Sequence, residues 1–95
     1  MLDCIRIACA VPEVRVADVA KNVADICNDI AKADRDGSDL VVFPELALTG
    51  YTCADLFFQK TLLDACLDGL REIIQHSKSC PSLTAVIGLP ILLAG

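Results

Sequence analysis

Three short apolar runs alternate with two stretches of helical periodicity, and this alternation allows few folds. The runs are residues 4–10 (CIRIACA), 40–43 (LVVF) and 83–91 (LTAVIGLPI). They are too short for amphipathic helices, and they suit strands of a covered sheet. The intervening segments are long enough to hold helices, which makes the strands neighbours joined by crossovers. The sequence therefore predicts an α/β fold of order βαβαβ, with right-handed connections and a largely parallel sheet.

Both intervening segments have one apolar face. The first predicted helix begins at Asp18 and stops at Gly37, and its apolar face holds Val19, Val23, Ile26, Cys27 and Ile30. The second has an apolar face of Leu63, Cys66, Leu67, Leu70, Ile73 and Ile74, with Gly69 weakening it slightly. Since two helices can cover only one face of three strands, we expect the opposite sheet face to need a further partner.

Composition limits both the size of the unit and its partners. The chain has 95 residues, 55% of them apolar, which leaves room for one core and suggests that residues 1–95 are an incomplete part of a larger domain. Its 13 acidic and 8 basic residues lack the basic patch that nucleic acids require. The sequence has neither a signal-peptide pattern nor an apolar run of about 18 residues, so we expect a cytoplasmic protein without a membrane partner.

The six cysteines form no CxxC pair, and we expect reduced, mostly buried thiols rather than disulfides. His76 and Cys80, with Cys66, could be imagined as metal ligands. We favour a helix-end histidine beside a turn cysteine, because no second paired motif accompanies them. The sequence therefore predicts no metal site.

The run VVFPELALTGY places the carboxylate of Glu45 almost directly after an apolar strand. Binding sites of open parallel sheets gather at the carboxyl ends of the strands. Apolar surroundings there would raise the pKa of this carboxyl group and suit it to proton transfer near neutral pH. The alternative is a solvated glutamate at a strand end. Pro44 keeps Phe43 extended and aims the next residue.

The same run resembles the first signature of the nitrilase (carbon-nitrogen hydrolase) superfamily, in which a Phe-Pro-Glu segment supplies the glutamate of a Glu-Lys-Cys triad. The strings FPELALTGYTCADLFFQ and IRIACAVPEVRVADVAKNVADI resemble, more particularly, the N-terminal glutaminase domains of glutamine-dependent NAD+ synthetases. The resemblance runs from about Ile5 to Pro90, and VIGLP fits the family's next strand. It implies the βαβαβ portion of a nitrilase-like αββα sandwich.

The resemblance implies hydrolysis of the glutamine side-chain amide. In this family a cysteine thiolate attacks the amide, the glutamate acts as general base and then acid, and a lysine stabilises the oxyanion. Only Glu45 matches a triad position, because the family's lysine and cysteine belong to later motifs, so we expect residues 1–95 alone to be inactive. Lys60 and Cys53 lie outside those motifs, and we expect neither to be catalytic. The resemblance puts Tyr51 at the rim of the glutamine pocket, with core packing as an equal alternative.

In the family the released ammonia passes to a synthetase domain of the same chain, which amidates an adenylated nicotinate dinucleotide. We expect ATP and Mg²⁺ only in that domain, no cofactor in residues 1–95, and a homo-oligomeric parent. Two rival readings stay open. One is a stand-alone carbon-nitrogen hydrolase that acts on another amide, and the other is a non-catalytic βαβ module that binds a partner through its uncovered sheet face.

Overall fold

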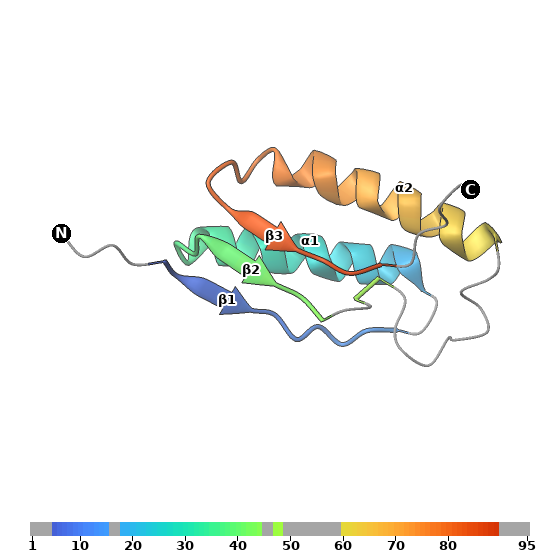
Figure 1. Ribbon diagram of the computed structural model, residues 1–95, viewed down its shortest axis with the longest axis horizontal. Helices are drawn as coiled ribbons and strands as arrows, with labels where there is room; N and C mark the ends of the chain where they lie inside the picture. The colour runs from blue at the N-terminus through green and yellow to red at the C-terminus, as the bar shows by residue number, and fades with distance from the viewer. Residues whose placement is uncertain (1–4, 16–17, 45–46, 49–59, 90–95) are drawn as a thin grey trace, which may run out of the picture.

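A computed structural model describes residues 5–15, 18–44, 47–48 and 60–89 of the chain. The elements follow in the order β1 (Ile7–Cys9), α1 (Val19–Arg35), β2 (Leu40–Val42), α2 (Lys60–Ser77) and β3 (Thr84–Val86) (Figure 1). The predicted βαβαβ order is confirmed. Neither helix in these described ranges is long and apolar enough to cross a bilayer.

The three strands form one parallel sheet in the order β1-β2-β3. Backbone pairing continues past the strand ends, since Ala10 N–H donates to the Val42 carbonyl (2.9 Å) and Phe43 N–H to the Val86 carbonyl (3.0 Å). The strands are shorter than the predicted runs because both outer strands pair with the same three residues of β2, and Pro12 cannot extend a ladder. Residues 4, 90 and 91 of the predicted strands lie outside the described residues.

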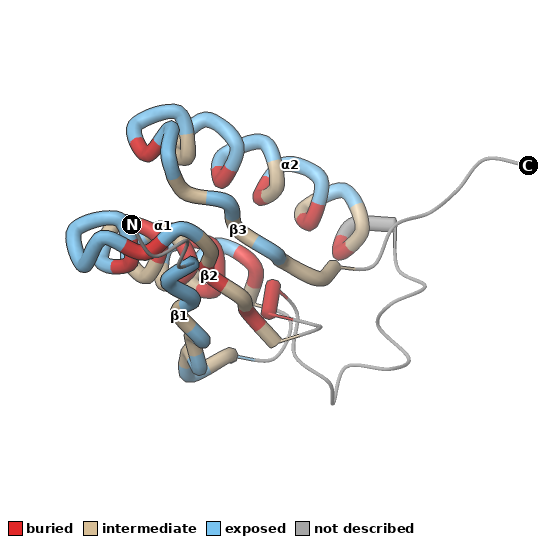
Figure 2. The backbone as a smooth tube through the Cα atoms, turned by 60° about the vertical axis from the view of Figure 1, so that its left-hand side comes forward, coloured by how far each residue is buried: buried red, intermediate tan, exposed pale blue. Residues whose placement is uncertain are grey.

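Both helices lie on the same side of the sheet and pack against each other (Figures 1 and 2). Strand order follows chain order, so the two crossovers step in the same direction, and connections of the same hand then leave their helices on one face. A row of small and medium side chains across the sheet faces these helices. Val41 in the middle of this row is buried, and Ala8 and Ala85 on either side pack against the core.

The opposite face of the sheet is open within the described part of the chain. Ile7 of β1 is 56% exposed and Val86 of β3 is 49% exposed, while Leu40 and Val42 of β2 are half-buried. The outer strands are exposed on this face because both helices lie on the other one (Figures 1 and 2). The expectation that the second face lacks a cover is confirmed for these residues.

Helix α1 begins and ends where its capping residues predict. The Asp18 carboxylate accepts a hydrogen bond from Lys21 N–H (3.2 Å) and caps the first turn. At the other end, Gly37 has φ +76° and donates to the Asp34 carbonyl, while Ser38 N–H reaches back to the carbonyl of Ala33. This pair of bonds is a Schellman motif, and it explains why a glycine is favoured at position 37.

Helix α2 meets its neighbours along a narrower stripe than the sequence predicts. Its buried positions recur at spacings of four, three and four: Leu62, Cys66, Gly69 and Ile73. Leu67 and Ile74, which were expected on this face, are 37% and 51% exposed, because α1 covers only the stripe. Gly69 allows the close approach, since a methyl group there would lie 2.7 Å from Val23 Cγ2. The glycine therefore fits the helix contact rather than merely weakening a helix.

Four cysteines fall within the described residues, and the structure has them as reduced thiols. Cys66 and Cys80 are buried, Cys27 is half-buried, and Cys9 is exposed. The exposure of Cys9 departs from the expectation of mostly buried thiols. It has the same cause as the exposure of Ile7, since both residues alternate with the covered Ala8 along β1.

Candidate active site

The carboxyl ends of the three parallel strands meet at one edge of the sheet, where the sequence predicts the chemistry. Glu45 and Tyr51, the predicted base and pocket residue, both lie outside the described residues, so their roles stay predictions. The described residues closest to Glu45 in the chain are Pro44 and Ala47. Phe43 is buried and its N–H is bonded to β3, so the chain enters this segment from a fixed point.

The chain is fixed again at Leu48, three residues after Glu45 in the sequence. Ala47 and Leu48 are both fully buried. The Leu48 side chain lies between the two helices, close enough that a methyl group on Gly69 would be 3.4 Å from Leu48 Cδ2 and 3.1 Å from Val19 Cγ1. Packing therefore holds this short turn against the first turns of α1 and the middle of α2.

A single buried amide joins this turn to the loop that follows β1. Asn22, in the first turns of α1, is 2% exposed. Its Nδ2 donates to the Leu48 carbonyl (2.6 Å) and to the Arg15 carbonyl (2.7 Å), and its Oδ1 accepts from Arg15 N–H (2.8 Å). The opposite orientation of the amide would set its oxygen against two carbonyls and its NH₂ against an N–H. Only the observed orientation satisfies all three contacts.

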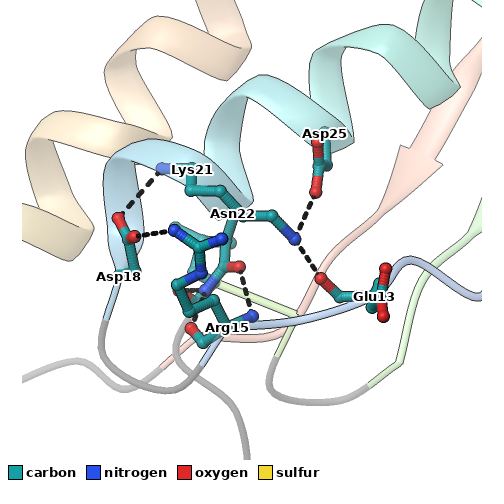
Figure 3. Close-up of polar contacts among 7 residues, drawn as sticks. Glu13, Arg15, Asp18, Lys21, Asn22 and Asp25 are labelled. Carbon is teal, nitrogen blue, oxygen red and sulfur yellow. Dashed lines mark hydrogen bonds and ion pairs between the residues drawn. The ribbon is translucent and has the colours of Figure 1, made fainter.

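Neighbouring charges hold the same loop more loosely from the side exposed to solvent (Figure 3). Lys21 Nζ pairs with Asp25 (2.7 Å), one turn further along α1, and donates to the Glu13 carbonyl. Arg15 pairs with the capping Asp18 at 3.3 Å, with the two side chains 66% and 37% exposed. Exposed pairs of this kind contribute little, typically less than about 1 kcal/mol. The buried amide of Asn22 is therefore the principal polar anchor between the two loops.

Sequence reasoning missed Asn22, although the sequence carries a signal for it. Asn22 follows Val19 by three positions and precedes Ile26 by four, which puts it on the apolar face of the predicted helix. A polar side chain on a buried face must find hydrogen-bond partners, and here the partners are backbone groups of two loops. Which loops would supply them could not be read from the sequence, since Leu48 is 26 residues away.

The other residues weighed from the sequence do not form a second centre in the described part of the chain. Lys60 is the first residue of α2, and Cys53 lies outside the described residues. His76 is half-buried in the last turn of α2, as expected of a helix-end histidine, and Cys80 is buried in the turn beyond. Within the described ranges, no three metal-ligating side chains come together.

Cys27 is the cysteine of α1, and its environment disfavours reactivity. Burial raises the pKa of its thiol, and the nearby Glu72 carboxylate raises that pKa further. Because the thiolate is the nucleophilic form, a raised pKa leaves this cysteine protonated and weakly reactive at neutral pH. Cys27 therefore makes a poor substitute for a catalytic cysteine.

The fold of the chain and the Phe-Pro-Glu segment after its middle strand both fit the carbon-nitrogen hydrolases. Residues 6–85 match the model of the carbon-nitrogen hydrolase family, and the chain belongs to that family. Among curated proteins, it is 33% identical over 91 residues to a glutamine-dependent NAD(+) synthetase of Mycobacterium tuberculosis, covering 96% of this chain and 12% of the relative. The synthetase of Xylella fastidiosa is 36% identical over 91 residues, covering 95% of this chain and 16% of that protein.

A solved structure shares the fold as well as the sequence pattern. The crystal structure of a glutamine-dependent NAD(+) synthetase from Cytophaga hutchinsonii superposes with a TM-score of 0.83 at 33% identity. It matches 96% of this chain, which corresponds to 15% of the synthetase chain. The chain thus spans well under a fifth of the length of the synthetases that it resembles.

Proposed function

We propose that residues 1–95 form the N-terminal part of the glutaminase domain of a glutamine-dependent NAD+ synthetase. The observation that carries the proposal is the segment Phe43-Pro44-Glu45, directly after the middle strand of a carbon-nitrogen hydrolase fold. Identity of 33–36% to NAD(+) synthetases over nearly the whole chain supports this branch of the family.

Glu45 is the general base in this proposal. It takes the proton from the attacking thiol of a cysteine supplied by a later segment and returns it to the departing ammonia. Tyr51 lines the glutamine pocket, where a ring with a hydroxyl group can both pack and donate a hydrogen bond. The ammonia then serves an ATP-dependent amidation in a separate synthetase domain of the same chain. In this proposal residues 1–95 supply the general base, and later segments supply the nucleophilic cysteine and the lysine.

ATP and Mg²⁺ belong to that synthetase domain in the proposal. Mg²⁺ prefers oxygen ligands, usually one or two carboxylates with waters and substrate phosphates. In the proposal, residues 1–95 contribute proton transfer and substrate contact.

The proposal is tested by ammonia release from glutamine, measured on the 95-residue chain and on the full-length synthetase that we infer contains it. We expect no release by the chain alone and turnover by the full-length protein. Glu45→Gln should abolish that turnover, with a loss of at least about 100-fold, because the amide keeps the shape but cannot exchange the proton. Glu72→Gln, the same change at an exposed site on α2, is the matched control and should stay active.

Two results would count against the proposal. Glutamine turnover by the 95-residue chain would show that these residues do not need a lysine and a cysteine from later segments. A fully active Glu45→Gln protein would disprove the role of Glu45. Turnover of another amide in place of glutamine would favour the stand-alone hydrolase. A parent sequence that lacks a synthetase domain would point the same way.

One observation, the open face of the sheet, favours the alternative of a non-catalytic βαβ module. Ile7 of β1 and Val86 of β3 are large apolar side chains exposed on this face. Exposed apolar side chains grouped on one sheet face are typical of a surface that another segment or protein covers. In the preferred proposal the rest of the same domain covers this face.

A further inference from the structure

We propose that Asn22 is a positioning residue for Glu45, acting through the backbone of Leu48; this inference rests on the proposed role of Glu45 as the general base. Glu45 itself is not described, so the argument uses the points at which the chain is fixed on either side of it. These points are Phe43, bonded to β3 (N···O 3.0 Å), and Leu48, bonded to Asn22 (N···O 2.6 Å).

The length of chain between the two anchors is what couples them to Glu45. Only four residues separate Phe43 from Leu48, and Glu45 is one of them, so a displacement of either anchor acts on a very short segment. A proton-transfer group has to stay within hydrogen-bond reach of its partner, and a shift of about 1 Å can cost roughly 100-fold in rate. A change in the position of Leu48 is therefore expected to change the position of the Glu45 carboxylate.

The chemistry of Asn22 suits it to this task better than packing alone would. Its bonds to Arg15 N–H and to the Arg15 carbonyl fix the plane of the amide, and this leaves one Nδ2 hydrogen aimed at Leu48. The side chain is 2% exposed, so water cannot replace a lost bond easily. Rotation of the amide would break all three bonds together. Asn22 thus holds Leu48 at a defined distance from the first turns of α1.

The location of Asn22 along α1 supports a local effect at the site. Helix α1 starts at the carboxyl end of the sheet and runs back toward the amino ends of the strands, as a crossover between parallel strands must. Ile30 is equally buried on the same helix but lies eight residues further on, about 12 Å along the axis. Removing Ile30 side-chain atoms should disturb the core without moving the Leu48 anchor.

The test uses steady-state glutamine hydrolysis by the full-length protein, with Asn22→Asp, Asn22→Ala, Asn28→Asp and Ile30→Ala. Asn22→Asp keeps the shape and the acceptor for Arg15 N–H but removes both donors, and Asn22→Ala removes all three bonds without burying a charge. We expect kcat to fall at least about 10-fold in both Asn22 variants, with KM for glutamine changed less than about 3-fold. Asn28→Asp, the same change at an exposed position of α1, should leave both constants unchanged.

Ile30→Ala is the control for lost stability. It should lower the unfolding temperature while the folded enzyme keeps its kcat. Equal losses of kcat in Ile30→Ala and Asn22→Ala would overturn the proposal, as would a kcat within 2-fold of the wild type in both Asn22 variants. Failure of both Asn22 variants to fold, with Ile30→Ala folded, would assign Asn22 a structural role only and would also overturn it.

Hydrogen–deuterium exchange on the same proteins tests the anchor without relying on activity. We expect peptides spanning residues 43–48 to exchange faster in both Asn22 variants. The Arg15 amide should lose protection only in Asn22→Ala, because the carboxylate introduced by Asn22→Asp still accepts its hydrogen bond. Unchanged exchange over residues 43–48 would overturn the proposal. A wild-type protein that releases no ammonia would instead disprove the proposed function, and the exchange result would still decide whether Asn22 anchors this segment.

Discussion

The ionised carboxylate of Asp29, in α1, lowers the stability of the folded state. Burial raises the pKa of its carboxyl group, the Asp25 carboxylate one turn earlier raises it further, and Lys32 opposes these effects more weakly. The folded state therefore holds the Asp29 proton more tightly than the unfolded chain does. As the pH rises through the folded pKa, ionisation favours the unfolded chain, so this residue makes the protein less stable at neutral pH than at acidic pH.

Asp29→Asn should consequently stabilise the protein at pH 7. We expect the free energy of unfolding to rise by less than about 1 kcal/mol, because Asp29 is only half-buried and its charge is partly screened. The gain should vanish near pH 3, where both folded and unfolded carboxyl groups are protonated. Urea denaturation at the two pH values measures it, with the exposed Asp64→Asn as a control that should bring no gain. A larger gain at pH 3 than at pH 7 would contradict this assignment.

Residues differ in how far the sequence alone identifies them. Glu45 was predicted because a carboxylate after a strand, within a family signature, is visible in the order of residues. Asn22 was not, because its partners Arg15 and Leu48 come from separate loops that only the folded chain brings together. The order of residues suggests Glu45, whose role stays a prediction, but it does not show which backbone groups Asn22 meets across the fold.

At the level of elements, the contact between α1 and α2 depends on Gly69. A methyl group at this position would lie 2.7 Å from Val23 Cγ2 and 3.1 Å from Val19 Cγ1. Both valines are branched at Cβ and have restricted rotamers in a helix, so neither can easily turn aside. The overpacking cost, about 1–3 kcal/mol, therefore outweighs the gain of roughly 1 kcal/mol in helix propensity from glycine to alanine.

We expect Gly69→Ala to lower the free energy of unfolding by up to about 2 kcal/mol. A double-mutant cycle with Val23→Ala checks the cause, because removal of the Val23 methyl groups leaves space for the new one. The double variant should be more stable than the sum of the two single changes predicts. Strict additivity in urea denaturation would show that the clash with Val23 is not the source of the loss.

The order of the elements is predictable because each one has its own pattern of apolar residues. The lengths of the elements are not predictable in the same way. The ends of α1 follow from the residues that cap it, Asp18 and Gly37, and these were predicted. The ends of β1 and β3 depend on the three residues that β2 offers for pairing. Leu67 and Ile74 were assigned to a buried face because α2 is apolar over a wider arc than α1 covers.

For the molecule as a whole, the open sheet face has a measurable consequence. The described residues cover one face with two helices and leave Ile7 and Val86 exposed on the other. We expect the 95-residue chain to self-associate through this face, with an apparent mass that increases with concentration in sedimentation velocity. The double change Ile7→Thr and Val86→Thr keeps strand propensity, removes apolar area and should shift the chain toward monomer.

Leu67→Gln is the matched control for that experiment. It removes a large exposed apolar side chain from α2, which lies on the other side of the sheet from the open face (Figures 1 and 2), and should leave the association unchanged. A stable monomer that binds no dye specific for apolar surfaces would contradict the expectation. Equal effects of Leu67→Gln and the strand variants would mean that association does not depend on the sheet.

The buried amide of Asn22 also bears on how cooperatively the chain folds. If α1 docks on the sheet before the turn at Leu48 is in place, an Nδ2 hydrogen of Asn22 is buried without an acceptor. This costs about 1–3 kcal/mol. Partly assembled states with a docked helix and an open loop are therefore penalised. Asn22 and Leu48 are 26 residues apart in the chain, so this bond favours folding in which the helix and the turn at Leu48 form together.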